Sequence, residues 1–360
     1  MKISNIECLV VDGLYPYVII DTDQGITGVG ECFRRAPWVI KSAIETVFSE
    51  IVLGKDPTDS SNIWNQLYEA ASVCGPYGSL LTAISGIDIA IWDINLQVSS
   101  IPLHSILGSK KKNQIKLYAS SMKRDMSPEE EADRAASYYD QGYSFYKMHS
   151  AYPEEIDSPR DRTIQHVEAI RKKLGDKLEV MVDVNGAYST KKAIEIGKQL
   201  QDLNVFQFEQ PVHVTDLDGL KQVSDSLDIP VASGECCYTV GDFKHLIKQG
   251  NPDIVQPDVV KTGGITEFLK IFPFIKSQNK SIMIHNTQPL ISTAVHAHFL
   301  ANDEDLTLPL EYNIEKISIR ENPIIRNNFE AKNGMINVPE SAGIGLDFDI
   351  SEMRKRQTLI

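Results

Sequence analysis

Seven ionisable side chains recur along the chain at intervals of roughly one strand plus one helix. Each closes a short apolar stretch, and successive members are 23 to 34 residues apart: His149, Asp183, Glu209, Glu235, Asp258, His285 and Glu311. In a closed barrel of parallel strands, catalytic residues come from the carboxyl ends of several different strands. The spacing therefore predicts one site at which all seven side chains meet.

Three of these residues are carboxylates on consecutive predicted strands, namely Asp183, Glu209 and Glu235. Like charges held this close repel one another unless a cation neutralises them. Ligation by oxygen atoms alone favours Mg²⁺ or Mn²⁺ over zinc. We expect these three carboxylates to hold one Mg²⁺ per chain, with Mn²⁺ as a substitute ion. The alternative, for any one of them alone, is a helix cap or a surface acid.

The residues around these positions form an ordered set of short motifs. They read Val-Asp-Val-Asn-Gly at 182–186, Phe-Glu-Gln-Pro at 208–211, Ser-Gly-Glu at 233–235, Gln-Pro-Asp at 256–258, Ile-His-Asn at 284–286 and Leu-Glu-Tyr at 310–312. Together they resemble the mandelate racemase branch of the enolase superfamily. The resemblance covers nearly the whole chain.

The resemblance implies a role for each matching residue. His285 would be a general base with Asp258 oriented against it, and Glu311, in protonated form, would hydrogen-bond a substrate carboxylate oxygen. Lys147 matches the first lysine of the family's Lys-x-Lys motif and would contact the same carboxylate. The three carboxylates already named would be the metal ligands, and Asn185 would belong to the substrate-binding set.

The chain departs from the family at the second lysine of that motif. It reads Lys147-Met148-His149, so a histidine takes the second base position. Histidine is a good base near neutral pH, but it is shorter than lysine. We therefore expect His149 to differ in role from His285, as a base, an acid or a binding group. Lys261, three residues after Asp258, is expected to pair locally.

Two arginines, Arg34 and Arg35, follow the third predicted strand, where the capping loops of the family reach the site. We expect one of them to bind a distal anionic group of the substrate, with an ordinary surface arginine as the alternative. Substrate specificity would lie in the loops over residues 13–16, 31–38 and 150–160.

The elements that must position these side chains follow two different patterns. Strands are predicted over residues 2–12, 17–23 and 28–32, and helices over residues 40–52, 61–71 and 79–96. From residue 115, short apolar strands alternate with helices, which is typical of a parallel sheet. Seven or eight such units in a row predict a closed barrel.

We therefore expect an α/β fold with a (β/α)7β TIM-like barrel over residues 114–322. The basic run at 110–112 marks its start. The resemblance implies that residues 1–113 form an α+β capping domain, to which residues 323–360 return as a C-terminal tail.

The overall composition limits the partners. The chain has 360 residues and a formal net charge of -13, which argues against nucleic acid or an anionic membrane as the main partner. Glu7 interrupts the N-terminal apolar stretch, and no apolar run approaches the length of a membrane span. Five cysteines without a Cys-x-x-Cys motif favour reduced thiols and a cytoplasmic location. The expected partners are a small carboxylate substrate and further copies of the chain in a homo-oligomer.

The pattern predicts an enzyme that removes the proton next to a substrate carboxylate, with a metal ion stabilising the enediolate. Within the family resembled, dehydration of an acid sugar to a 2-keto-3-deoxy acid is the leading expectation, which would make the protein a magnesium-dependent carbon–oxygen lyase. A racemase or epimerase of a hydroxy acid is the first alternative. A non-catalytic protein that binds sugar acids is the second.

Overall fold

A small antiparallel sheet begins the chain. In the computed structural model, which describes residues 1–359, β1 (Ile3–Val11), β2 (Tyr15–Thr22) and β3 (Thr27–Glu31) pair in that order. The connection between β1 and β2 is shorter than the sequence suggested, because Asp12 and Gly13 both adopt positive φ and turn the chain within three residues.

Helices pack on one face of this sheet. They are α1 (Pro37–Ala43), a π-helical turn (Ile44–Phe48), α2 (Ser49–Val52), α3 (Ser60–Ser72) and α4 (Ser79–Val98). The single helix expected over residues 40–52 is thus three consecutive helical segments. Strand β3 lies directly against α4, since a Cβ atom added at Gly30 would come within 1.8 Å of the Gly86 carbonyl oxygen.

Helix α4 corrects one expectation from the sequence. It has 20 residues and a mean hydropathy of 1.3 over its most apolar window, so its length and composition do match those of a membrane span. However, 78% of that window is buried inside the protein. The apolar character of α4 is therefore explained by its place in the core between β3 and the barrel.

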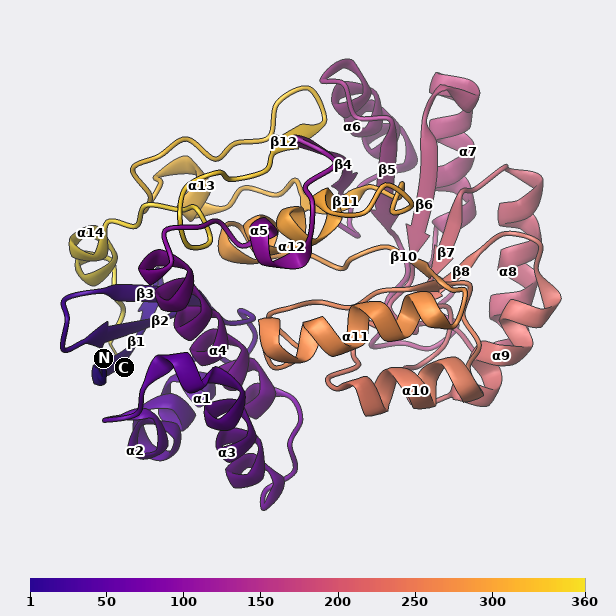
Figure 1. The fold of residues 1–360 in the computed structure, drawn as a ribbon. Coiled ribbons are helices and arrows are strands. Elements are labelled where there is room, and N and C mark those ends of the chain that lie inside the picture. Colours follow the sequence, from indigo (N-terminus) through magenta and orange to yellow (C-terminus); the bar gives the residue numbers. More distant parts are fainter. Residues whose placement is uncertain (360) are drawn as a thin grey trace.

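The rest of the chain forms a curled parallel sheet surrounded by helices (Figure 1). Eight parallel strands run in the order β11-β4-β5-β6-β7-β8-β9-β10. The strands are β4 (Gln114–Ser120), β5 (Phe145–His149), β6 (Glu179–Asp183), β7 (Gln207–Glu209), β8 (Val231–Ser233), β9 (Ile254–Val255), β10 (Ser281–Ile282) and β11 (Leu310–Asn313).

Seven helices connect successive strands and cover the outside of the sheet. They are α6 (Pro128–Asp140), α7 (Thr163–Leu174), α8 (Thr190–Asp202), α9 (Leu217–Ser226), α10 (Val240–Gln249), α11 (Ile265–Ser277) and α12 (Ile291–Ala301). This arrangement confirms the predicted (β/α)7β fold. Ser127 caps α6 and forms a capping box with Glu130.

The sheet closes between β10 and β11 through a side chain. Asn286, which follows β10, donates from its backbone N–H to Glu311 Oε2 at 2.8 Å and from its side-chain amide to the Glu311 carbonyl at 3.0 Å. Because these two bonds join the seventh and eighth strands of the barrel, which do not pair as strands, Glu311 is held at the seam of the barrel.

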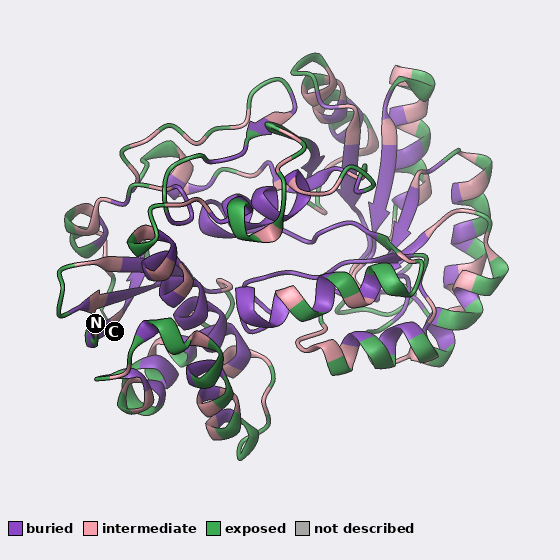
Figure 2. Ribbon diagram, viewed as in Figure 1, coloured by how far each residue is buried: buried purple, intermediate pink, exposed green. Residues whose placement is uncertain are grey.

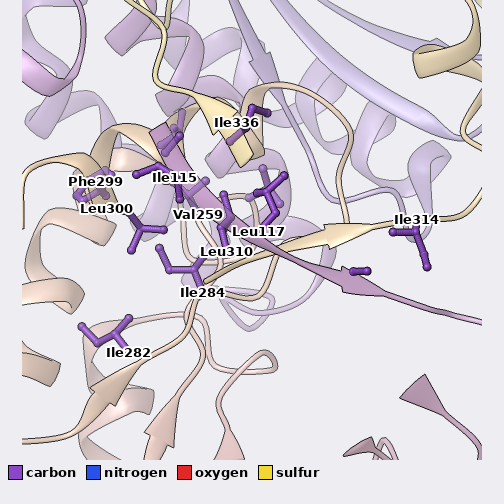
Figure 3. Packing of buried hydrophobic residues seen from close by; sticks show 14 of the residues in the cluster. Ile115, Leu117, Val259, Ile282, Ile284, Phe299, Leu300, Leu310, Ile314 and Ile336 are labelled. Atoms are coloured by element: carbon purple, nitrogen blue, oxygen red, sulfur yellow. The ribbon is translucent and has the colours of Figure 1, made fainter. Parts of the chain in front are cut away.

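Apolar side chains fill the interior of the barrel and the space beneath its helices. Figure 3 shows part of this core, in which Leu117 of β4, Leu310 of β11 and Ile284, which follows β10, pack together with Ile336 from the C-terminal segment. Helices α6 to α10 are buried on the face toward the sheet and exposed on the other (Figure 2). This is the amphipathic pattern that makes a βα unit readable from sequence.

After β11 the chain crosses back over the molecule through α13 (Ser318–Glu321), β12 (Met335–Asn337) and α14 (Ile350–Lys355). Strand β12 pairs antiparallel with β4, and the tail then bridges Val11 to Gln357 at the edge of the N-terminal sheet. The division at residues 113/114 and 322/323 stays a proposal, and these contacts support it.

Candidate active site

A cavity of about 410 Å³ opens at the carboxyl ends of the barrel strands. Its roof is formed by the segment after β3, and its floor by strand-end side chains. Nine of the residues selected from the sequence line it: Arg34, Arg35, Lys147, His149, Asp183, Asn185, Glu235, His285 and Glu311. Two others, Glu209 and Asp258, lie directly behind this layer, where they contact Lys147 and His285 respectively. The fold therefore brings together all eleven residues.

The register of the parallel strands explains why these side chains meet. His149 at the end of β5 pairs with Asp183 at the end of β6, and Asp183 pairs with Glu209 at the end of β7. Three consecutive strands thus end level with one another. Asn185 follows in a positive-φ conformation (φ 45°), and its backbone N–H donates to Asp183 Oδ1 at 2.9 Å. This hydrogen bond from Asn185 orients the carboxylate of Asp183.

Lys147 lies at the centre of the carboxylates. Its ammonium is 3.0 Å from Glu209 Oε2, 2.9 Å from Glu311 Oε1 and 3.6 Å from Asp183 Oδ2. Burial alone would lower the pKa of Lys147, but the charges of Glu209 and Glu311 outweigh it and hold the pKa well above its usual value. Lys147 is therefore a fixed positive charge in this arrangement.

The same contact changes the expected state of Glu311. Burial would raise its pKa, but Lys147 and His285 lower it to about 2. Ser120 also donates a hydrogen bond to Glu311 Oε1 at 2.7 Å. Glu311 is thus held as a carboxylate here, whereas the sequence analysis expected a protonated group. The reason is the ammonium at 2.9 Å.

His285 lies between two carboxylates. Its Nδ1 is 2.7 Å from Asp258 Oδ2, the contact expected from the sequence, and its Nε2 is 2.7 Å from Glu235 Oε2. Burial would lower its pKa, but the charges of Glu235 and Glu311 and the hydrogen bond with Asp258 raise it to about 10. Asp258 therefore fixes the ring, and Nε2 is the nitrogen that faces the cavity.

His149 comes from a strand that is not next to the one that carries His285. It lies at the end of β5, and strands β6 to β9 separate β5 from β10, which His285 follows. The Nδ1 of His149 is 2.5 Å from the carbonyl oxygen of Ser121. A carbonyl oxygen can only accept, so Nδ1 donates this bond, and Nε2 likewise faces an acceptor, Asp183 Oδ2, at 2.9 Å. The cavity therefore presents two imidazole Nε2 atoms from non-adjacent strands.

The chemistry of Asp183, Glu209 and Glu235 fits a hard divalent cation, since all three are buried or half-buried oxygen ligands at consecutive strand ends. At present their oxygens contact Lys147, His149 and His285. Within residues 1–359, no three acidic, histidine or cysteine side chains already converge on one point at metal-binding distances. A cation at this site would therefore require the carboxylates to exchange those contacts for metal ligation.

The two arginines of the roof differ. Arg34 is partly buried, and its Nη1 donates to the Thr287 carbonyl at 2.9 Å, to Thr287 Oγ1 at 2.6 Å and to Gln288 Oε1 at 3.0 Å. Arg34 thus holds the segment after His285. Arg35 also lines the cavity but is exposed. Of the pair, Arg35 is the one without such anchoring contacts among the described residues.

Two cationic residues of the cavity were not selected from the sequence. Arg124, in the connection after β4, donates to the Ala151 carbonyl at 2.9 Å and to the side-chain oxygen of Asn185. Lys261 was expected to pair locally, but no carboxylate of residues 1–359 lies within 4.0 Å of its Nζ, which instead lies 4.9 Å from the centre of the Phe33 ring. No spacing rule connects Arg124 or Phe33 to the site. Lys261 follows Asp258 by three residues, which was the available signal.

A larger cavity, about 600 Å³, lies between α4 and the C-terminal tail. Its buried carboxylate, Asp93, already accepts hydrogen bonds from the backbone N–H groups of Val29 and Ile344 and from Gln97. With its acidic group satisfied in this way, the larger cavity lacks the reactive constellation found at the strand ends.

Two family profiles together match most of the chain. The profile described as the enolase C-terminal domain-like family matches residues 130–353, and the profile of the mandelate racemase / muconate lactonizing enzyme N-terminal domain matches residues 11–108. Among curated proteins, the arabinonate dehydratase of Saccharolobus solfataricus is 29% identical over 333 residues, covering 91% of this chain and 86% of that enzyme.

Solved structures agree over the full length. The 3,6-anhydro-D-galactonate cycloisomerase from Zobellia galactanivorans is 30% identical, with a TM-score of 0.89 and 100% coverage of both chains. A mandelate racemase/muconate lactonizing protein from Paracoccus denitrificans, solved in complex with magnesium, is 26% identical, with a TM-score of 0.93 over 100% of this chain and 99% of that one.

Proposed function

The chain belongs to the mandelate racemase / muconate lactonizing enzyme family of the enolase superfamily, and it is therefore an enzyme, either a lyase or an isomerase. We propose that it removes the α-proton of an acid sugar and eliminates water to form a 2-keto-3-deoxy acid. The observation that carries the proposal is His285, which Asp258 holds at 2.7 Å in the same cavity as Lys147. Because the chain belongs to a family of enzymes, the alternative of a non-catalytic protein that binds sugar acids is not retained.

We assign the ligation of one Mg²⁺ to Asp183, Glu209 and Glu235, with Mn²⁺ as a substitute ion. When bound, the cation supplies positive charge that lowers the cost of the developing enediolate. The solved relative that contains magnesium supports this assignment. Lys147 contributes a second positive charge that is already buried and oriented, so it need not reorganise during the reaction.

The proton chemistry is divided between two histidines. His285 Nε2 accepts the α-proton once Glu235 has turned to the cation, because the charge of Glu235 is the main cause that raises the pKa of His285 and keeps Nε2 protonated. The hydrogen bond from Nδ1 to Asp258 keeps the ring in position. The bond between C3 and its oxygen then breaks, and the departing hydroxide takes a proton and leaves as water. His149 Nε2, from β5, is the group we assign to that protonation. The remaining enol tautomerises to the 2-keto acid.

The same first step serves two other reactions. If the C3 oxygen belongs to a ring ether, elimination opens the ring without loss of water, which is the type of reaction that the name of the Zobellia relative indicates. If a proton instead returns to the opposite face of the α-carbon, the product is an epimer. The two Nε2 atoms on non-adjacent strands are the observation that favours this second candidate.

The test is a product screen with the purified enzyme and Mg²⁺ in deuterated water. Single diastereomers of aldonic acids, aldaric acids and their anhydro derivatives are incubated separately, and the products are measured by mass spectrometry and by a keto-acid assay. A product lighter by one water that reacts as a 2-keto acid supports dehydration. An isomeric keto acid from an anhydro sugar supports ring opening. Deuterium at the α-carbon of both epimers, without keto acid from any compound, would show that the enzyme is an epimerase.

The remaining expectations belong to the same proposal. The substrate is a small carboxylate, and Arg35 is the residue we assign to a distal group of it, with Asn185 and Arg34 acting nearby. The five cysteines are unpaired, which fits the proposed cytoplasmic location. Assembly into a homo-oligomer is likewise proposed, and light scattering of the purified protein measures it directly.

A further inference from the structure

Helix α12 is buried along its whole length, although it is one of the helices on the outside of the barrel. All eleven of its residues are buried, whereas α8, α9 and α10 each expose one face to solvent (Figure 2). The N-terminal sheet accounts for part of the cover, because β3 packs on α12. The first turn of α12 therefore lies at a junction between the capping segment and the barrel.

Glu31, the last residue of β3, makes a direct polar contact with the first turn of α12. It is fully buried, and its Oε2 accepts a hydrogen bond from the backbone N–H of Ser292 at 2.8 Å. Its Oε1 accepts a second hydrogen bond from the hydroxyl of Tyr17 at 3.0 Å. A carboxylate is favourable at a helix N-terminus, where backbone N–H groups lack partners inside the helix. Glu31 thus holds the start of α12 from the capping side.

The same turn of α12 lies against Asp258. Ser292 Oγ is 3.5 Å from Asp258 Oδ1, on the side of the carboxylate that faces away from His285. One turn later, His296 Nε2 accepts a hydrogen bond from the backbone N–H of Val259 at 3.0 Å. A nitrogen that accepts is unprotonated, and burial lowers the pKa of His296 to about 4, so this histidine is a neutral support. Asp258 Oδ1 also accepts a hydrogen bond from the Val260 backbone N–H at 3.1 Å, so Asp258 is held both by its own loop and, through Ser292 and His296, by α12.

The segment between His285 and α12 is held from the capping side as well. Gln288 donates from its side chain to the Cys32 carbonyl at 2.9 Å, and Arg34 donates to the Thr287 carbonyl at 2.9 Å. Residues 31–34 therefore contact both ends of the connection that carries His285. Of the bonded residues, Arg34 and Thr287 themselves line the cavity.

We propose that Glu31 is a positioning residue for the proton-transfer pair, acting through Ser292 and the first turn of α12 on Asp258 and thereby on His285. The inference rests on the proposed function, because it assigns proton transfer to His285. Its consequence is that the capping segment sets the geometry of the base in addition to covering the substrate. Glu31 itself does not touch the substrate.

The competing explanation is that Glu31 only joins the two parts of the protein. Asp88 provides a matched comparison, because it too is a buried carboxylate of the capping helices that binds the start of a barrel helix. Its Oδ2 accepts from the Thr266 backbone N–H at 2.9 Å, at the first turn of α11. Asp88 does not contact the helix that supports Asp258. Glu31→Gln and Asp88→Asn therefore make the same chemical change at the first turns of α12 and α11, but only Glu31 contacts the residue, Ser292, whose side chain lies against the carboxylate of Asp258.

The first experiment compares kinetics on the acid sugar turned over by the wild type. We expect Glu31→Gln to lower kcat at least tenfold while KM and the Mg²⁺ concentration for half-maximal activity stay within twofold. Asp88→Asn should lower the melting temperature by a similar amount and change kcat less than twofold. Equal kcat in Glu31→Gln and the wild type overturns the proposal, and so does a parallel loss of kcat in both variants.

Two further variants test the route through Ser292. Ser292→Ala removes the contact with Asp258 but keeps the backbone N–H that binds Glu31, so it should lower kcat in the same direction. In a double variant that combines Glu31→Gln with Ser292→Ala, the two losses of kcat should not multiply, because both changes interrupt the same chain of contacts. Fully multiplicative effects would contradict the route. Tyr17→Phe, which removes only the second hydrogen bond to Glu31, supplies a milder change if Glu31→Gln does not fold, and it should lower kcat by a smaller factor; unchanged kcat there counts against the proposal.

A crystal structure of the Glu31→Gln variant tests whether Glu31 positions the Asp258–His285 pair, and this test does not require a known substrate. We expect the Asp258–His285 contact to lengthen beyond hydrogen-bond distance in this variant and to persist in Asp88→Asn. An unchanged contact in Glu31→Gln overturns the inference. If the wild type acts on no acid of the library, the proposed function fails, and the Asp258–His285 distance still decides whether Glu31 positions the pair.

Discussion

At the residue scale, the site balances a group of buried carboxylates with a few cations placed between them. Glu209 shows how tightly the charges are coupled, because burial and the neighbouring charge of Asp183 raise its pKa to about 8 despite the ammonium of Lys147 at 3.0 Å. Removing or adding one charge therefore changes the state of several neighbours.

One prediction concerns the base. Changing His285→Asn should lower turnover by about 10²–10⁴-fold, the usual contribution of a general base, because asparagine keeps a polar contact with Asp258 but cannot take a proton. The rate of α-proton exchange with deuterated water, followed by mass spectrometry, measures the loss directly. His213→Asn makes the same change at an exposed position and should leave the rate unchanged. Wild-type exchange in His285→Asn would remove this residue from the mechanism.

A second prediction concerns the metal. Changing Glu209→Gln should abolish both turnover and Mg²⁺ binding by calorimetry, since a neutral amide at the centre of the three carboxylates is a much weaker ligand for a hard cation. A chelator should stop the wild type, and added Mg²⁺ should restore it. Glu50→Gln, at an exposed position, is the control. Full turnover in excess chelator, with no metal detected in the purified protein, would refute the metal assignment.

At the scale of elements, buried carboxylates of the capping segment bind the first turns of two barrel helices. Glu31 meets α12 and Asp88 meets α11. Burial raises the pKa of each to about 7, against the hydrogen bonds that each accepts. A carboxylate can bind the backbone of a helix in this way only at its first turn, because the N–H groups there have no partner inside the helix. They make the stability of the junction depend on pH.

The sign of that dependence follows from proton linkage. The folded state binds a proton on Asp88 more tightly than the unfolded state, so this contribution to stability is complete below the ordinary aspartate pKa of 3.8 and is lost as pH rises through about 7. We expect Asp88 alone to lower the unfolding free energy by roughly 1–3 kcal/mol between pH 5 and pH 8, and the raised pKa of Glu31 acts in the same direction.

Urea titrations at the two pH values measure the effect. Asp88→Asn should show a smaller fall, because the amide cannot ionise, while the exposed control Asp140→Asn should follow the wild type. A wild-type stability that rises between pH 5 and pH 8, with Asp88→Asn parallel to it, would contradict this account.

At the scale of the whole molecule, the last residues of the chain close the structure on its first ones. Met353 of α14 is fully buried, and the Thr358 N–H donates to the Val10 carbonyl at 3.0 Å. Arg356 pairs with Asp12 across the same edge. The edge strand β1 is therefore covered by the tail, so the sheet that carries Glu31 depends on residues more than 300 positions away.

This arrangement predicts a large cost for a small change at the end of the chain. Met353→Ala should lower the unfolding free energy by about 2–5 kcal/mol, as expected for a buried side chain whose cavity cannot fully collapse. Leu359→Ala, only six residues later but 76% exposed, should change it by less than about 0.5 kcal/mol. Denaturant unfolding of both variants measures the difference. Equal stabilities would mean that the tail does not contribute to the fold.

The sequence alone determined the barrel and the ring of residues at its mouth. Asp183, Glu209 and Glu235 could be selected because each βα unit has nearly the same length, and because parallel strands all present their carboxyl ends on one side. The pairing of His149 with Asp183 and of Asp183 with Glu209 follows from that regularity. The periodic burial of the helices and the capping residue Ser127 are local signals of the same kind.

Only the tertiary structure decided how the capping segment meets the barrel. Glu31 and Ser292 are 261 residues apart, and Arg34 and Thr287 are 253 apart. No spacing rule links such pairs, because their approach depends on how two separately patterned units pack. The same is true of Lys261, whose ammonium lies over Phe33 rather than beside a local acid. Local periodicity determines which strand end carries a side chain, whereas its partners across the domain junction are determined by packing.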